Sequence, residues 1–314
     1  MKENRRTFLK EVAGCGSGLL LAARAAAAAD WKTQVGLELF TVRDLLPNDY
    51  EGTLAKVAEI GYKEVEPATD YAKLDAKQFR ALLDRYGLSA PTTHVGASEG
   101  PDLEKQLEGF QIMGIRYTEI RGGGGGGAQG ARGRGAAGAA PAGGARGEEA
   151  VKRTAQQINQ HGQIARKFGM KMLIHNHTQE FEPIEGSKLR PYDILLAETD
   201  PAVVAMQLDI GWASVAGQNI LEMFRKNPGR YELWHVKDAT GLKSADPKLT
   251  PNQRRQATSL VPVGLGDVDY KTIFANAELA GMKHFCIEQD NANAWGDSLA
   301  AARVSYQNLV KMLS

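Results

Sequence analysis

The chain has 314 residues, with 38 Lys and Arg against 37 Asp and Glu and a formal net charge of +1. It has room for one large domain or two ordinary ones, and its hydrophobic content of 43% is typical of a globular protein. The near-balance of charge argues against a polyanionic partner such as DNA.

The first segment has the pattern of an export signal. Arg5 and Arg6 form a twin-arginine pair, a short apolar stretch follows, and the small residues up to Ala29 resemble a cleavage site. The apolar stretch is too short and too rich in Ala and Gly to be a good membrane span. We therefore expect residues 1–29 to be cleaved after export by the twin-arginine route; an uncleaved anchor is the alternative. The mature protein would be periplasmic or extracellular, without stable membrane insertion.

Cysteine usage limits the chemistry of the mature chain. The sequence contains Cys15 and Cys286. If Cys15 leaves with the signal, the remaining thiol has no partner for a disulfide within the chain. A metal site built on cysteine is then not expected either.

Residues 30–314 alternate between apolar runs with strand character and amphipathic helical patterns. Helical periodicity is expected in residues 54–60, 75–86, 103–113, 148–168, 192–198, 220–225, 274–280 and 300–312. The strand-like runs are residues 34–40, 62–67, 89–95, 116–121, 170–177, 203–211, 231–238 and 284–290.

Eight strand–helix units predict an α/β protein with a parallel sheet, and eight is the number that closes into a barrel. We therefore predict a single (β/α)8 TIM-barrel domain over residues 30–314. An open doubly wound sheet is disfavoured because no G-x-G-x-x-G pattern follows the first strand.

A Gly-rich segment at residues 122–147 interrupts the barrel pattern after the fourth strand. It has no periodic apolar residues and too little apolar surface to order itself. We interpret it as a flexible, disordered insertion that acts as an inert linker. The alternative is a basic lid that uses Arg132, Arg134 and Arg146.

The segment "GLGDVD" at residues 264–269 superficially resembles a phosphate-binding loop. It lacks the required Lys and does not directly follow a strand. We predict a turn that starts the next helix.

Titratable side chains mark the carboxyl ends of the predicted strands, where a barrel of this type places its functional residues. Carboxylates gathered there would repel one another and resist burial, and a divalent cation resolves the repulsion. A mixture of imidazoles and carboxylates fits one Mn²⁺, Zn²⁺, Fe²⁺ or Co²⁺ ion better than Ca²⁺. The residues are Glu38, Glu66, His94, Glu119, His175, His177, Asp209, His235 and Glu288.

The stretch "LIHNHTQEF" concentrates three such groups at the end of the fifth strand. His175 and His177 are two residues apart, so both imidazoles lie on one face of a strand. Glu180 follows three residues later.

Several motifs of the chain resemble the sugar phosphate isomerase/epimerase family, the xylose-isomerase-like TIM barrels. The similar segments are "LELFTVRD", "LDIGWASVAG", "LWHVKDA", "VPVGLGDVDY" and "FCIEQD". The resemblance runs from about residue 35 to the end of the chain, excluding the Gly-rich segment. It implies a TIM barrel with a metal centre. The substrate stays open, because this family includes isomerases, epimerases, dehydratases, lyases and endonucleases.

The resemblance also implies a set of metal ligands. The family's usual quartet is Glu, Asp, His and Glu, and its last three positions match Asp209, His235 and Glu288. His175 stands at the position of the first Glu, so we expect it to replace that carboxylate. Glu180 is the alternative fourth ligand.

A second departure from the family pattern is Trp212, where many members have a substrate-contacting His. An indole can stack on a sugar face but carries no protons. We expect Trp212 either to bind substrate or to pack at the barrel rim.

The implied chemistry is proton abstraction next to a carbonyl, with a metal ion as Lewis acid. Glu180 or Glu288 is the candidate base, and His177 is the candidate acid or second base. Lys237 is a candidate clamp on substrate oxygens; a structural pair with Asp238 or Glu66 is the alternative. The expected sugar-pocket residues are Glu38, Glu66, His94 and Glu119, although His94 could instead be a core histidine.

These features favour a metal-dependent carbohydrate isomerase or epimerase acting on a small sugar or glycoside. A lyase or dehydratase acting on a keto-sugar or keto-glycoside begins with the same proton abstraction. A metal-dependent DNA endonuclease of the same fold is disfavoured by the balanced charge and the export signal. A non-catalytic sugar-binding protein would not need the intact metal trio. We expect no nucleic-acid partner, and a homo-oligomer is compatible with the sequence.

Overall fold

A computed structural model describes residues 31–121 and 147–314. The predicted export signal and residues 122–146 of the predicted insertion lie outside these ranges. Contacts divide the chain into Met1–Gln34, which includes the short turn η1 (Trp31–Thr33), and Val35–Ser314, which contains the barrel. Among the described helices, none is long and apolar enough to cross a membrane.

Seven strands form one parallel sheet in the order β2-β1-β11-β8-β7-β6-β4. Each lies within one of the runs predicted from the sequence. Their bounds are β1 (Gly36–Glu38), β2 (Glu64–Glu66), β4 (Tyr117–Thr118), β6 (Lys171–His175), β7 (Val204–Asp209), β8 (Leu233–Val236) and β11 (His284–Ile287).

The third predicted strand is not a regular strand, but it closes the ring between β2 and β4. Parallel bridges join Ser89 to Glu64 of β2 and Thr92 to Tyr117 of β4. Pro91 lies between the two bridges and has no backbone N–H to donate to a ladder, so pairing here stays short. The predicted (β/α)8 barrel is confirmed, with this irregular third position.

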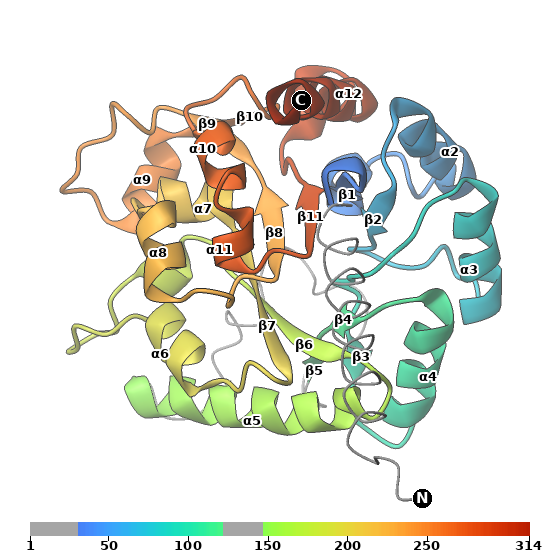
Figure 1. The fold of residues 1–314 in the computed structure, drawn as a ribbon, viewed down its shortest axis with the longest axis horizontal. Helices are drawn as coiled ribbons and strands as arrows, with labels where there is room; N and C mark the ends of the chain where they lie inside the picture. The colour runs from blue at the N-terminus through green and yellow to red at the C-terminus, as the bar shows by residue number, and fades with distance from the viewer. Residues whose placement is uncertain (1–30, 122–146) are drawn as a thin grey trace, which may run out of the picture. The chain divides into compact units, whose positions relative to one another are not determined.

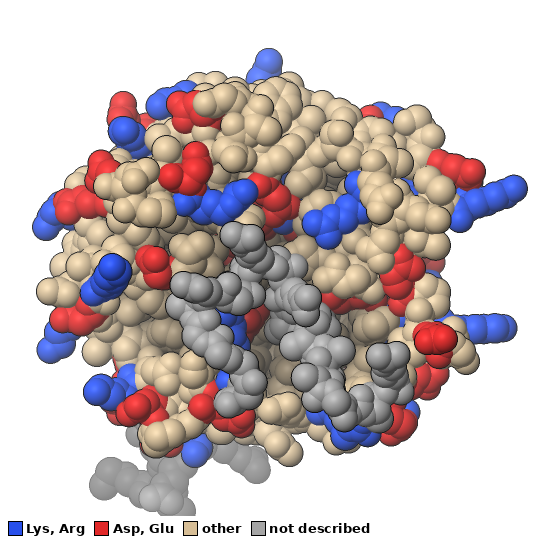
Figure 2. Space-filling view, turned by 180° about the vertical axis from the view of Figure 1, so that it is seen from behind, with Lys and Arg blue, Asp and Glu red and all other residues tan. Residues whose placement is uncertain are grey.

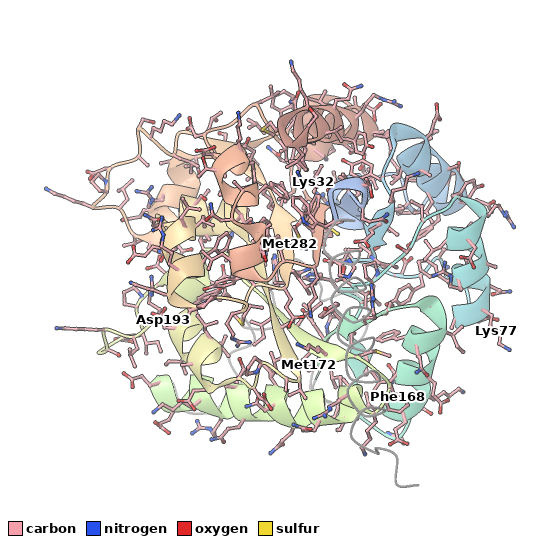
Figure 3. All side chains as sticks on the ribbon, viewed as in Figure 1. Lys32, Lys77, Phe168, Met172, Asp193 and Met282 are labelled. Carbon is pink, nitrogen blue, oxygen red and sulfur yellow. The ribbon has the colours of Figure 1, made fainter. Side chains whose placement is uncertain are left out.

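Helices form an outer layer around the strands (Figure 1). In α3 the apolar residues Phe79, Leu82 and Leu83 are buried, while the side chain of Lys77 projects outward in Figure 3. This is the pattern of a helix that packs one face on a sheet. The helices are α2 (Tyr50–Ile60), α3 (Ala76–Arg85), α4 (Leu103–Met113), α5 (Glu148–Arg166), α6 (Pro191–Glu198), α7 (Ile210–Val215), α8 (Ile220–Lys226), α9 (Pro251–Ala257), α10 (Tyr270–Phe274), α11 (Ala277–Ala280) and α12 (Ser298–Leu313).

The structure departs from the sequence prediction in the connections. The helix predicted at residues 274–280 is two short helices, α10 and α11. The predicted fourth strand divides into β4 and β5, and β5 pairs with the short β3. Helices α7 and α9 and the antiparallel pair of β9 with β10 were not predicted. The remaining short elements are β3 (Ala97–Ser98), β5 (Ile120–Arg121), β9 (Asp238–Thr240), β10 (Ser259–Val261), η2 (Leu39–Val42), η4 (Gln179–Phe181) and η5 (Ala292–Trp295).

One layer of the barrel interior consists of Tyr117, Leu173, Ala205 and Leu233, which form a buried cluster. Strand side chains alternate between faces, so the interior side chain of Leu173 puts His175 on the same face, nearer the carboxyl end of β6. The same alternation on β7 and β8 brings other strand-end side chains above this apolar layer.

Candidate metal centre and active site

Four side chains from four adjacent strands meet at the carboxyl end of the barrel. His175 ends β6, Asp209 ends β7, His235 lies in β8, and Glu288 directly follows β11. All four are buried, and one ligand atom from each lies within 4.8 Å of the others. The structure therefore brings together the quartet selected from the sequence, with His175 and not Glu180 as its fourth member.

The donor atoms of this group point at common space. His175 Nε2 lies 3.4 Å from Asp209 Oδ2, and His235 Nδ1 lies 2.7 Å from Glu288 Oε2. The ammonium of Lys237 also approaches Glu288 Oε2, at 2.9 Å. Two imidazoles and two carboxylates placed in this way fit one divalent transition-metal ion.

Asp209 is held by the start of α7 and by the Asn176 side chain. Its Oδ1 accepts a 2.7 Å hydrogen bond from the Trp212 amide and so caps α7, which leaves Oδ2 for the cluster. Asn176 accepts from the Asp209 amide at 3.0 Å and donates to its carbonyl at 3.2 Å. Gly211 allows the close approach of β8, because a Cβ there would lie 2.4 Å from Lys237 Cβ.

Lys237 lies among the carboxylates of the cluster and is 1% exposed. Its Nζ is 3.2 Å from Asp209 Oδ2, 2.9 Å from Glu288 Oε2 and 3.2 Å from Asp290 Oδ2. Burial alone would lower the pKa of this amine, but the three carboxylates outweigh burial and raise the pKa well above its usual range. The ammonium ion is therefore charged and fixed beside two of the candidate ligands.

The alternative pairing of Lys237 with Asp238 is wrong, because Asp238 points to the 264–269 loop. Its carboxylate accepts hydrogen bonds from the amides of Gly264 at 2.9 Å, Gly266 at 3.1 Å and Val268 at 3.2 Å. Asp269 then caps α10 through the Thr272 amide. The prediction that "GLGDVD" is a turn starting a helix is confirmed.

Glu66 is completely buried and lies behind His235 as seen from the cluster. Its Oε1 is 2.8 Å from His235 Nε2 and 2.9 Å from His94 Nε2. Gln207 donates to its Oε2 at 2.8 Å and contacts His94 Nε2 at 2.7 Å. Burial raises the pKa of Glu66, but the two histidines outweigh it and hold the pKa well below its usual range. A substrate contact for Glu66 stays a prediction, whereas its support of His235 is direct.

Replacing Glu66 with Gln should weaken divalent-metal affinity by about 10- to 100-fold, because a carboxylate that accepts from a ligating imidazole fixes its tautomer and orientation. Competition with a chromophoric chelator measures this affinity without any need for turnover. Glu64→Gln is the matched control, because Glu64 also lies in β2 and contacts a histidine, His284, at 2.9 Å, away from the cluster. Equal affinities of the wild type and Glu66→Gln would contradict the assignment.

Glu38 and Glu119 carry polar atoms available to a ligand. Burial, and after it the charge of Glu288, raises the pKa of Glu38 well above its usual range. Glu38 Oε2 and Glu119 Oε1 are buried and lack hydrogen-bond partners in the described part of the chain. Glu119 Oε1 lies 3.8 Å from His94 Nδ1. These placements are compatible with the predicted sugar-pocket role of Glu38, Glu119 and His94, which stays a prediction.

The loop after β6 carries His177 and Glu180. Glu180 Oε2 accepts a 2.7 Å hydrogen bond from the His177 amide, and Oε1 is buried with no partner among the described residues. Burial raises the pKa of Glu180. The His177 ring lies 4.8 Å from the His175 ring, and burial, followed by the His175 charge, lowers the pKa of His177 to about 2. Glu180 therefore has an oxygen without a partner in the described part of the chain, on the same loop as the His177 imidazole.

Trp212 is 4% exposed and packs with Val215 and Ala239, which matches the packing alternative considered from the sequence. The Lys237 ammonium lies 5.3 Å and the Arg255 guanidinium 4.4 Å from its ring centroid. Its Nε1 is buried and has no partner within the described ranges. A direct substrate contact by Trp212 stays a prediction.

Sequence reasoning missed four residues that shape this site. Gln207 and Asp290 are each two residues from a predicted ligand, so strand alternation already placed them on the same face as Asp209 and Glu288. Asn176 separates the two paired histidines and was not considered. Arg255 lies on the unpredicted α9, and no sequence signal placed it at the site.

The fold and the site together define an α/β-barrel protein with a His- and carboxylate-rich centre at the carboxyl ends of its strands. A match to the family described as xylose isomerase-like TIM barrel covers residues 54–305. The chain belongs to this family.

The most similar proteins include enzymes with different names. An inosose dehydratase of Clostridium perfringens is 30% identical over 134 residues, which are 40% of this chain and 42% of that protein. A sugar phosphate isomerase/epimerase of Parabacteroides distasonis has a similar structure, with a TM-score of 0.66 and 18% identity over 88% of this chain and 97% of that one. The IolI protein, solved with a bound zinc atom, gives a TM-score of 0.60 and 14% identity over 90% and 98% of the two chains. The matched part of the curated relative is less than half its length, and the two structures support the fold alone.

Proposed function

We propose that this protein is a metal-dependent enzyme that removes a proton next to a carbonyl in a sugar or sugar-derived substrate, as a carbohydrate isomerase or epimerase. The observation that carries the proposal is the buried group of His175, Asp209, His235 and Glu288. The loop that follows His175 adds Glu180, whose Oε1 is buried and has no partner among the described residues. We also propose that the ion is Mn²⁺, Zn²⁺, Fe²⁺ or Co²⁺ and that the enzyme acts after export.

The proposed reaction assigns separate roles to Glu180 and Lys237. The chemistry supplied by a bound divalent ion is polarisation of the substrate carbonyl and stabilisation of negative charge on its oxygen. Glu180 takes the α-proton at Oε1, and burial supports this role by raising the pKa of the carboxyl group. Lys237 keeps a fixed positive charge beside the ligand carboxylates, where negative charge develops on the substrate.

A dehydratase or lyase is the second candidate, because the curated relatives are named inosose dehydratase. Both reactions begin with the same proton transfer to Glu180. They differ in whether the proton returns to carbon or a β-substituent leaves.

Proton NMR of the metal-loaded protein in D₂O tests the proposal, with free sugars, inososes and keto-glycosides as substrates. We expect deuterium to enter at a carbon next to the carbonyl. A new epimer or isomer identifies the first reaction, and loss of water or of an aglycone identifies the second. Full retention of every carbon-bound proton across the panel would refute both.

A further inference from the structure

Arg255 lies at the open end of the barrel because α9 is held against the active-site loop. The Asn252 amide donates to Glu182 at 2.8 Å, and Thr178 contacts the Asn252 side chain at 3.3 Å. A capping box at Thr250 fixes the start of the helix. Arg255 is therefore positioned by an ordered element beside η4.

The guanidinium of Arg255 has no protein acceptor within residues 31–121 and 147–314. The side chain is exposed and lies over the Trp212 ring, with Cζ 4.4 Å from the centroid. The preceding residue, Arg254, differs: it donates to the Val215 carbonyl at 2.8 Å and to the Asp246 carbonyl at 3.4 Å. Stacking on an indole orients a guanidinium and leaves its N–H groups available for a ligand.

Trp212 connects this cation to the reaction site. The same ring lies 5.3 Å from Lys237 Nζ and 6.5 Å from the His177 ring. The positive charge of Arg255 also acts on Glu180, where it opposes the rise in pKa caused by burial. One indole ring is thus in contact with both the buried ammonium of the cluster and the exposed guanidinium of Arg255.

We propose that Arg255 binds a carboxylate of the substrate, so that the reaction proposed above acts on an acidic sugar such as a hexuronate or ketohexuronate. The inference rests on the proposed function and names its substrate class. The planar fork of a guanidinium matches a carboxylate in two parallel hydrogen bonds.

A phosphate fits the surroundings less well. The amides of Gly264, Gly266 and Val268 are already bonded to Asp238, so this loop offers no cradle for a dianion. Lys237 is buried and occupied by three carboxylates. Within the described ranges, Arg255 is a guanidinium without a protein acceptor, and its single charge suits a singly charged group.

Equilibrium binding, measured by calorimetry on the metal-loaded protein, tests the inference without requiring turnover. The ligands are D-glucuronate with D-glucose, D-galacturonate with D-galactose, D-fructuronate with D-fructose, and D-fructose 6-phosphate as the phosphate arm. We expect at least one uronate to bind about 10- to 100-fold more tightly than its neutral partner, the range expected for charge-assisted hydrogen bonds. Arg255→Gln should abolish that preference and leave neutral-sugar affinity unchanged.

Lys248→Gln is the matched control, because it removes one positive charge from an exposed residue of the same connection, and it should keep the preference. Wild-type protein without preference for any uronate, or a preference that survives Arg255→Gln, would overturn the inference. So would a stronger, Arg255-dependent preference for the phosphate. Deuterium exchange into the neutral sugars, measured in parallel, tests the proposed function separately. Exchange into a neutral sugar without any preference for uronates would overturn the inference about Arg255 and leave the proposed function intact.

Discussion

Asp209→Asn is expected to lower divalent-metal affinity by more than about 100-fold and to abolish turnover, since loss of a ligand should exceed the roughly 10- to 100-fold cost of losing a supporting residue. Asn keeps the oxygen that accepts from the Trp212 amide, so the cap of α7 survives. What is lost is the negative charge of Oδ2, which lies 3.4 Å from His175 Nε2 and 3.2 Å from Lys237 Nζ. Elemental analysis after dialysis, with thermal unfolding in parallel, measures occupancy and folding independently.

The wild-type protein should carry about one transition-metal ion per chain, and chelation should abolish its activity. Glu288→Gln should behave like Asp209→Asn, because Glu288 supplies the second carboxylate of the group. Asp269→Asn is the control: Asp269 also caps a helix, α10, but lies outside the group. Full metal occupancy in both ligand variants would refute the proposed centre.

Glu180→Gln should keep the metal and lower the turnover rate by roughly 100- to 10,000-fold, the usual effect of removing a general base. The amide can still accept from the His177 N–H, which occupies Oε2 at 2.7 Å, so the loop conformation is preserved. His177→Ala should likewise keep the metal and lose turnover, whereas His175→Ala should lose the metal. Metal content and steady-state rates, measured on all three variants, separate the loss of a metal ligand from the loss of a catalytic group.

Glu182→Gln provides the control for this series. Glu182 follows two residues later and accepts from the Asn252 amide at 2.8 Å, so its substitution disturbs the same loop without touching the unpartnered oxygen. A metal-free Glu180→Gln together with a metallated His175→Ala would mean that Glu180 is the ligand and would reverse the two assignments.

The barrel could be predicted because it follows from simple periodicity, whereas the quartet also needed the family resemblance. Strands of a parallel barrel end at one rim, so the last residues of each apolar run collect a larger set of titratable side chains without any contact information. The resemblance then singled out Asp209, His235 and Glu288 from that set, with His175 at the remaining ligand position. Residue type then indicates the chemistry, because a buried mixture of imidazoles and carboxylates needs a cation or mutual pairing.

The parts that were not predicted depend on single local contacts. The helix expected at residues 274–280 breaks at Asn276, whose side chain donates to the Thr272 carbonyl at 2.9 Å and precedes a second, separate helix. Helix α9 depends on the capping box of Thr250 and Gln253 in a segment with no apolar periodicity. The position of Arg255 follows from that helix, so only the folded chain reveals it.

Charges on the surface follow the composition more closely. On the face drawn in Figure 2, Lys and Arg lie interspersed with Asp and Glu, as the formal net charge of +1 suggests. Negative charge is concentrated instead in the interior, where carboxylates at and just beyond the strand ends surround Lys237.

The irregular third strand should open locally more easily than the other strands of the barrel. Strands β6 and β7 share four paired residues, whereas the segment around Pro91 has one isolated bridge on each side, supplemented by backbone hydrogen bonds such as Val65 N–H to the Ser89 carbonyl and Arg116 N–H to the Pro91 carbonyl. Amide hydrogens in this segment should exchange with solvent sooner than those of β6 and β7, because local opening separates fewer paired residues. Glu66 precedes this segment and His94 ends it, so the contact between them spans the least protected part of the ring. Glu66 also contacts His235, so transient separation of Glu66 from His94 would weaken the support of the His235 imidazole while β8 stays paired. Local opening of the backbone would thereby be coupled to metal affinity.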